Sequence, residues 1–357
     1  MASQQPNLPL HSQILSVAPT KQEDSPLFAV LPPEIREQIF SYALSDYPDP
    51  NPQNHYEEET YYSRPSYFAP RRTDTALLQT CRAVYAETWF LPFMLREQVH
   101  WLSSNARAPP DYRGASGLRQ DLKRIEAQLG EGHVEIAHLR AFAQMFMLEE
   151  NKLRKLMKVR GLHPRVVTLT IRHTDWWYWE DDEPLRFEAH FLRSMVQMLP
   201  ASVREFHIEL ETTARRREQV EYIAERMCER WFFERRDGPV LWADASGASC
   251  EVSEWRGPST WGGKRWTRDE TEEGVIDYHI ISVPFRLEHV VERGGGRISD
   301  RARSNFKRHF LNDNEMTLDA AVLGISRVAQ STDGESGEEE FEDGSGDDES
   351  EDGSGAH

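Results

Sequence analysis

The chain of 357 residues has few cysteines and no long apolar run. Its three cysteines, Cys81, Cys228 and Cys250, stand singly in the sequence, so they form neither a C-x-x-C metal pair nor an even disulfide framework. No stretch approaches the roughly 18 apolar residues of a membrane span, and the N-terminus lacks the charged-then-apolar pattern of a secretion signal. We therefore expect an intracellular protein, of the cytoplasm or the nucleus, without a membrane partner.

The sequence also lacks the spacings that mark common active sites. His133 and His138 are five residues apart, which misses the i, i+4 geometry of the H-E-x-x-H zinc motif, and the glutamate of that motif is absent. Gly257 and Gly262 have the spacing of a phosphate-binding loop, but Gly263 stands where the lysine belongs. No G-x-S-x-G nucleophile elbow is present. We therefore predict no catalytic residue, no metal and no cofactor, and an undetected enzyme is the third of three functional hypotheses.

The net charge of −18 is unevenly distributed along the chain. Residues 331–357 hold twelve acids and no lysine or arginine, so the remaining 330 residues carry only about −6. The segment 331–357 cannot bury enough apolar surface to fold, so we predict a disordered acidic tail. The polar segment 1–25 is also predicted to be disordered. Because a chain this acidic lacks a broad positive field, no nucleic-acid partner is expected.

The most informative stretch is residues 28–44. Pro32 and Pro33 suit the entry of a helix, where the first backbone N–H groups have no intrahelical partner to lose. Glu34 lies where the helix dipole favours a carboxylate. These features predict a short amphipathic helix. Its broad apolar face consists of Ile35, Ile39 and Ala43, flanked by Phe40 and Leu44.

A second amphipathic helix is predicted at Leu77–Trp89, with Asp74 as its N-cap and Pro92 limiting its extension. Between the two helices, residues 45–73 contain five prolines, an acidic run and several tyrosines. The apolar stripe of the second helix comprises Leu77, Cys81, Val84 and Thr88.

At these residues the chain resembles the F-box-like domain found at the N-terminus of many uncharacterised filamentous-fungal proteins. That family is marked by Leu-Pro-x-Glu-Ile-Arg-x-x-Ile-(Tyr/Phe) and, later, by Leu-Leu-x-Thr-Cys-Arg-x-(Val/Ile)-Tyr-x-Glu. The matching stretches here are Leu31–Phe40 and Leu77–Glu87. An ordinary F-box is continuous, whereas Ser45–Thr73 separates the two motifs in this chain.

In F-box proteins, the first motif binds the adaptor subunit of a cullin–RING ubiquitin ligase. The resemblance therefore implies a substrate receptor that carries a client protein to the ligase. Its implied adaptor-binding residues are Leu31, Pro32, Ile35 and Ile39.

The same helices also have a purely structural interpretation. The face of Ile35 and Ile39 could pack against Leu77 and Val84 as a local core, because apolar helix stripes are usually buried. The protein would then be a protein-binding scaffold unrelated to ubiquitin ligases, which is the second functional hypothesis. Both interpretations describe a non-enzymatic protein-interaction protein.

The rest of the sequence mixes strand and helix patterns, and its order of strand, helix, strand, helix and strand indicates βαβ-type units. The fold class is therefore predicted as α+β or α/β. Strands are predicted at 167–171, 206–210, 240–243 and 275–285, and helices at 118–129, 136–156, 187–199 and 220–231. The predicted organisation is a disordered segment 1–25, an F-box-like helical module 26–105 with its insert at 45–73, a helical segment 106–162, an α+β domain 163–290, a linker with short helices 291–330, and the disordered acidic tail 331–357.

An aromatic cluster follows the strand predicted at 167–171. Trp176, Trp177 and Trp179 stand among carboxylates at the C-terminal end of this strand, where α/β sheets commonly place ligand sites. They could bind a cationic side chain of a client protein. Alternatively, the tryptophans cover the end of the sheet and the acids form a solvated rim. A second aromatic patch is expected to pack against the first, and it consists of Trp255, Trp261 and Trp266.

Overall fold

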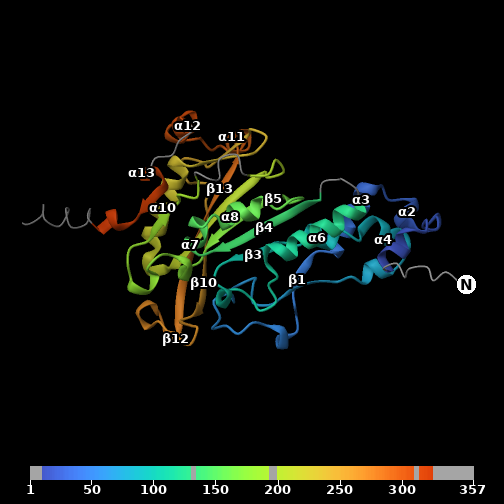
Figure 1. Cartoon of the computed structure of the whole chain (residues 1–357), viewed down its shortest axis with the longest axis horizontal. Helices are drawn as coiled ribbons and strands as arrows, with labels where there is room; N and C mark the ends of the chain where they lie inside the picture. Colours follow the sequence, from blue (N-terminus) through green and yellow to red (C-terminus); the bar gives the residue numbers. More distant parts are fainter. Residues whose placement is uncertain (1–9, 130–133, 193–198, 309–312, 325–357) are drawn as a thin grey trace, which may run out of the picture. The chain divides into compact units, whose positions relative to one another are not determined.

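The computed structural model describes residues 10–129, 134–192, 199–308 and 313–324 of the chain (Figure 1). Residues up to Ala320 belong to one unit, and residues from Ala321 onwards belong to a second. The first unit combines helices with a mixed sheet, so the predicted α+β class is confirmed. The predicted acidic tail, 331–357, lies outside the described residues.

An eight-stranded mixed sheet is the centre of the first unit. Its strands are β3 (Gln98–Leu102), β4 (Glu135–Ala143), β5 (His163–Ile171), β7 (Glu205–Thr213), β8 (Phe232–Glu234), β9 (Val240–Trp242), β10 (Glu251–Pro258) and β13 (Val275–Leu287). Their order is β3–β4–β5–β7–β13–β9–β8, and β10 also pairs with β13. β3, β4, β5 and β7 run parallel to one another, whereas β13 is antiparallel to β7, β9 and β10.

Several predicted elements are confirmed. The four predicted strands correspond to β5, β7, β9 and β13, and β5 and β7 are parallel neighbours, as the βαβ pattern indicates. Two predicted helices correspond to α6 (Gly114–Leu129) and α10 (Arg217–Arg230).

One face of the sheet is apolar and is covered by α10. Leu210 of β7 lies opposite Ile281 of β13, and both are buried. On the same side of β13, Nε2 of His279 lies 3.6 Å from the Glu221 carboxylate of α10. The residues that α10 buries are Val220, Ile223, Ala224, Met227 and Cys228.

The opposite face of the sheet carries charged side chains beneath the insert 45–73. Arg140 of β4 donates hydrogen bonds to Glu97 and to Glu209 of β7, each at 2.9 Å. The Tyr67 hydroxyl of the insert donates to the other Glu97 oxygen at 2.6 Å. Burial alone would raise the pKa of Glu97, but the charges of Arg140 and His138 and the Tyr67 hydrogen bond outweigh burial and lower it. The insert is therefore anchored to the polar face by buried charge.

The helix predicted from residue 136 onwards is wrong in its first part, which is strand β4. Short helices follow as α7 (Met145–Glu149) and α8 (Lys152–Met157). Ile136, Leu139 and Phe142 are three residues apart, which resembles helical spacing. In the strand, however, Leu139 points to one face and Phe142 to the other. The Phe142 ring lies beneath three guanidinium groups, those of Arg64, Arg140 and Arg172.

The boundaries predicted for the N-terminal half also differ from the structure. β3 and β4 belong to the sheet although they precede residue 163, where the α+β domain was predicted to begin. Residues 10–25 were predicted to be disordered but contain helix α1 (Leu10–Leu15). His11 of α1 places its Nδ1 atom 2.9 Å from the Tyr85 hydroxyl.

The predicted helix 187–199 is replaced at its start by strand β6 (Arg186–Glu188), which pairs with β14 (Thr317–Asp319). Residues 193–198 lie outside the described part of the chain. The predicted linker 291–330 does contain short helices, but residues of it pack into the core of the first unit. Ile298 and Ala302 belong to a core cluster with Phe232, Trp242 and Val291. The helices are α11 (Glu288–Arg293), α12 (Asp300–Lys307) and α13 (Asp313–Met316).

Candidate functional site

An ion pair joins the two motifs of the F-box-like resemblance. The first motif forms α3 (Pro33–Ala43), and the second contributes α4 (Arg82–Thr88). Arg36 of α3 donates from Nη2 and Nε to the two carboxylate oxygens of Glu87, at 3.0 and 3.2 Å. Its third nitrogen, Nη1, donates to the Leu31 carbonyl at 2.9 Å. A bidentate pair of this kind fixes both helices and the chain entry in one geometry.

The second predicted helix begins later than expected. A 3₁₀ turn over Ala76–Gln79 precedes α4, and Cys81 is the N-cap residue of α4. The Asp74 carboxylate accepts a hydrogen bond from the backbone N–H of Ala76, the first residue of this turn, whose N-cap is Thr75, so the predicted capping of the helix by Asp74 is wrong. A further helix, α5 (Leu91–Leu95), begins just before Pro92, which is compatible with its first turn.

The core between these helices uses only one side of α3. Phe40 and Leu44 are buried there with Val84 and Leu91. Residues of α2 (Pro26–Ala29) pack against the same cluster. This cluster does not contain Ile35 or Ile39, which are each 42% exposed, so the alternative in which their face is buried as a local core does not hold for these two side chains.

The other side of α3 exposes an apolar stripe. Ile35, Ile39 and Tyr42 occupy positions i, i+4 and i+7, and they are 42%, 42% and 85% exposed. Pro32 is exposed and Leu31 is half-buried at the start of the same helix. We call Ile35, Ile39 and Tyr42 the α3 stripe. All four residues implied by the F-box resemblance therefore lie on or next to one accessible helix.

The insert that separates the motifs is closed at its base by a small ladder. β1 (Asp46–Pro48) and β2 (Arg71–Thr73) pair antiparallel, with Tyr47 opposite Arg72. Arg71 also donates to the Asp46 carboxylate at 2.7 Å. The ladder holds the two ends of the insert together. The 29 residues of the insert therefore do not force α3 and α4 apart.

The aromatic cluster after β5 is mostly buried. Trp176 is 3% exposed and donates from Nε1 to the Glu211 carbonyl at 2.8 Å. Trp179 is 4% exposed, and its ring lies 4.6 Å from that of Trp266 and 5.9 Å from that of Trp261. The two aromatic patches therefore pack together as expected. Their burial closes the rings of Trp176 and Trp179 to a partner, while Trp177 is half-buried.

A solvated rim was one of the two alternatives for the acids beside these tryptophans. The structure shows that not all of these acids form such a rim. The Asp175 side chain is fully buried and accepts from Arg172 at 2.6 and 2.9 Å. Asp182 is paired with Arg215 and Arg216. Burial alone would raise the pKa of Asp182, but these two arginines lower it to about 2. Both acids thus bind arginines of the chain itself.

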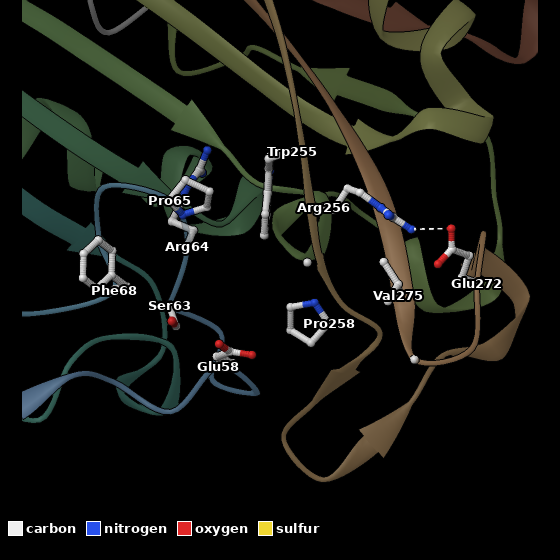
Figure 2. A pocket seen from close by; sticks show the side chains of 12 residues that line it. Glu58, Ser63, Arg64, Pro65, Phe68, Trp255, Arg256, Pro258, Glu272 and Val275 are labelled. Carbon is white, nitrogen blue, oxygen red and sulfur yellow. Dashed lines mark ion pairs between the residues drawn. The ribbon is translucent and has the colours of Figure 1, made fainter. Parts of the chain in front are cut away.

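An open cleft lies between the insert and the β10–β13 pair (Figure 2). Pro65 and Phe68 line one side, and Trp255 and Pro258 line the other; the Trp255 ring stands between β13 and the Pro65–Phe68 side. The volume is about 490 Å³. We call this space the Trp255 cleft.

The Glu211 carboxylate, which does not itself line the Trp255 cleft, contacts one residue from each of its walls. One oxygen, Oε2, lies 2.9 Å from Nη2 of Arg64 and accepts from Nε1 of Trp255 at 3.0 Å. The other oxygen accepts from the backbone of His173 at 3.3 Å. Because Arg64 and Trp255 come from opposite walls, Glu211 joins those walls. The cleft is therefore preformed and does not need a ligand to assemble it.

The walls are joined again by the hairpin of β11 (Thr260–Trp261) and β12 (Lys264–Arg265). Gly262, at its turn, donates its backbone N–H to the Glu59 carbonyl at 3.3 Å. Gly262 has φ +56°, a conformation that favours glycine, and a Cβ atom there would lie 3.0 Å from the Tyr61 ring.

Comparisons with known proteins identify no relative of this chain. The chain matches no family model, and no curated protein or solved structure is significantly similar to it. Among the described residues, no three His, Cys, Asp or Glu side chains are grouped so that they could hold a metal ion. In the same residues, no helix combines the length and apolar character needed to cross a membrane.

The Trp255 cleft was not predicted from the sequence. Trp255 was expected only to pack against the first aromatic patch, and Arg64 and Phe68 were not singled out. The available signal was the order Trp255, Arg256, Gly257 on a strand, because glycine two residues from a tryptophan leaves room for the ring. A Cβ atom at Gly257 would lie 2.2 Å from the Trp255 ring.

Proposed function

We propose that this chain is a non-enzymatic protein-interaction protein. Through the α3 stripe it docks onto the F-box adaptor subunit of a cullin–RING ubiquitin ligase. The observation that carries the proposal is the exposure of Ile35 and Ile39 on a helix whose opposite side is packed. Scattered exposed apolar residues are normal, but an aligned set on one helix is typical of a docking surface. The motif residues Leu31 and Pro32 adjoin this set.

The expected contribution of the stripe can be derived from its exposure. Full burial of an isoleucine contributes about 1.5–3 kcal/mol, and each of the two isoleucines is still 42% exposed. Docking would therefore gain about 1 kcal/mol from each. Together they would contribute about 2 kcal/mol, which is roughly a 30-fold change in the dissociation constant. An acidic residue at either position would cost more, because its charge would be desolvated at the interface.

The test is a binding titration of the full chain with a purified filamentous-fungal F-box adaptor subunit. Ile35→Asp and Ile39→Asp should each weaken binding at least about 30-fold. The matched control is Val290→Asp, because Val290 is 37% exposed on α11 and away from the stripe. The control should bind like the wild type, and all variants should keep the same circular dichroism spectrum.

Two outcomes would overturn the ligase proposal. One is equal adaptor binding by the wild type and both isoleucine variants. The other is the absence of adaptor binding by the folded wild-type chain. The scaffold hypothesis would then lead, supported by the preformed Trp255 cleft.

A further inference from the structure

We propose that the Trp255 cleft binds a lysine or arginine side chain from an extended segment of a partner protein. This inference deepens the protein-interaction part of the proposed function by naming the chemistry of the client. It does not depend on the ligase adaptor. It also replaces the buried cluster of Trp176 and Trp179 as the place where a client side chain meets an aromatic ring.

The Trp255 ring presents one face to the cleft. Its other face is stacked on Tyr278 of β13, with ring centroids 4.2 Å apart and planes inclined by 12°. In Figure 2 the ring is seen edge-on, with Pro65 and Phe68 across the gap. A tryptophan face is the best aromatic partner for a cation, contributing about 0.5–2 kcal/mol. The aliphatic stem of a lysine or arginine would fit between this face and the apolar Pro65–Phe68 side.

Two acids and two arginines line the cleft, and both arginines are already paired with acids of the chain. Arg256 is paired with Glu272 at 2.8 Å and with Asp277 at 3.0 Å. Arg64 is paired with Glu211, as described above. By contrast, Glu58 is exposed at the cleft and has no ion pair with any residue that the structure describes. The carboxylate left without a counter-charge therefore favours a cationic ligand.

The outer edge of β10 explains why the ligand segment should be extended. β10 forms part of the cleft wall, and among the described strands it pairs only with β13. Its outer N–H and C=O groups can therefore pair with an added strand, as in other edge-strand interactions. An added strand would carry its side chains past Trp255. The acidic residues 331–357 of this chain have the wrong charge to be that strand.

The test measures binding of the full chain to four labelled peptides by fluorescence polarisation. Each peptide is Thr-Val-X-Val-Thr with blocked ends, and X is lysine, arginine, norleucine or glutamate. Lysine and arginine should bind at least about tenfold more tightly than norleucine, which has a stem but no charge. Glutamate should bind most weakly.

Variants of the chain then locate the site. Glu58→Gln should weaken the lysine peptide about tenfold, whereas Glu57→Gln is the matched control and should not, because Glu57 does not line the cleft. Phe68→Ala should also weaken binding; Phe68 is 38% exposed, so the variant should fold. Trp255→Leu is less suitable alone because Trp255 also holds Glu211.

The results that overturn the inference are distinct from those that overturn the ligase proposal. Equal binding of lysine and norleucine peptides, wild-type binding by Glu58→Gln, or no peptide binding at all would each refute the cleft assignment. Ile35→Asp should bind the lysine peptide like the wild type. Loss of adaptor binding in that variant with unchanged peptide binding would show that the two surfaces act separately.

Discussion

Replacing Glu211 with glutamine should destabilise the protein strongly, although the change is nearly isosteric. The amide oxygen can still accept a hydrogen bond from Trp255, but the negative charge beside Arg64 is lost. The two side chains are only 7% and 4% exposed, so water cannot replace the missing charge. In addition, Nε and Nη1 of Arg64 are buried without a hydrogen-bond partner.

The magnitude follows from the distances to the two acids beside Arg64. At 2.9 Å and an effective dielectric constant of about 20, the attraction of Glu211 for Arg64 is about 6 kcal/mol. Glu209, at 3.8 Å, supplies about 4 kcal/mol and is shared with Arg140. Part of the loss is returned, because a neutral glutamine is less costly to bury than a carboxylate. We expect a net loss of about 3 kcal/mol, at the low end for a broken buried ion pair.

The assay is urea unfolding, followed by tryptophan fluorescence, of the wild type, Glu211→Gln, Arg64→Met and the double variant. The double variant should recover at least about 2 kcal/mol relative to the sum of the single losses, because no buried charge is then left alone. Glu58→Gln is the control for removal of an exposed carboxylate and should change stability by less than about 0.5 kcal/mol. Additive losses in the double variant would refute the reasoning.

Three further predictions use other parts of the unit. Burial lowers the pKa of His100 to about 4, so the folded protein favours the neutral imidazole. The free energy of unfolding should therefore be highest above pH 6.5 and should fall by about 3 kcal/mol towards pH 4. Urea unfolding of His100→Gln at the same pH values should lack this fall. The Sγ atoms of Cys228 and Cys250 lie 3.7 Å apart, so oxidised glutathione should join them and lower the thiol titre from three to one, whereas Cys228→Ser should keep both remaining thiols. Phe40→Ala should cost about 3–5 kcal/mol in urea unfolding because Phe40 is 2% exposed, whereas Ile39→Ala should cost under about 1 kcal/mol.

The sequence predicted strands best where one face is apolar and the next residue is polar. β5 and β7 alternate in this way, and α10 has a regular apolar stripe. β5 and β7 are neighbouring inner strands of the sheet, and α10 covers one of its faces. The fold class could therefore be predicted from these three elements. Their alternation survives in the sequence because the polar face of β5 and β7 holds threonine, histidine and glutamate, which are easily distinguished from the apolar set.

β4 was missed because its polar face is buried. On that face, Phe142 packs among arginines, and Arg140 takes part in an ion network with Glu97 and Glu209. Apolar residues therefore occur on both faces of β4, which removes the period of two. The partners of Arg140 are 43 and 69 residues away, and no local pattern reports such distant pairing.

The candidate sites also differ in how much of each could be predicted from the sequence. The exposed residues of α3 could be identified from the motif, but which side of α3 is packed depended on Phe40 meeting Val84 and Leu91. The Trp255 cleft requires two segments that are nearly 200 residues apart, and only the folded chain brings Phe68 opposite Trp255. The sequence therefore predicted a candidate docking helix but not the Trp255 cleft.

The β1–β2 ladder also has an evolutionary consequence. Because it fixes the distance between the ends of the insert, the loop beyond it can change length in related chains without disturbing the Arg36–Glu87 pair. Residues 51–55, which precede the cleft residue Glu58, could therefore change in number without disturbing that pair, whereas a deletion that removes Arg64 would leave Glu211 without its cation. The Arg36–Glu87 pair lies outside the insert that the ladder closes and Arg64 lies within it, so a change near one pair need not disturb the other.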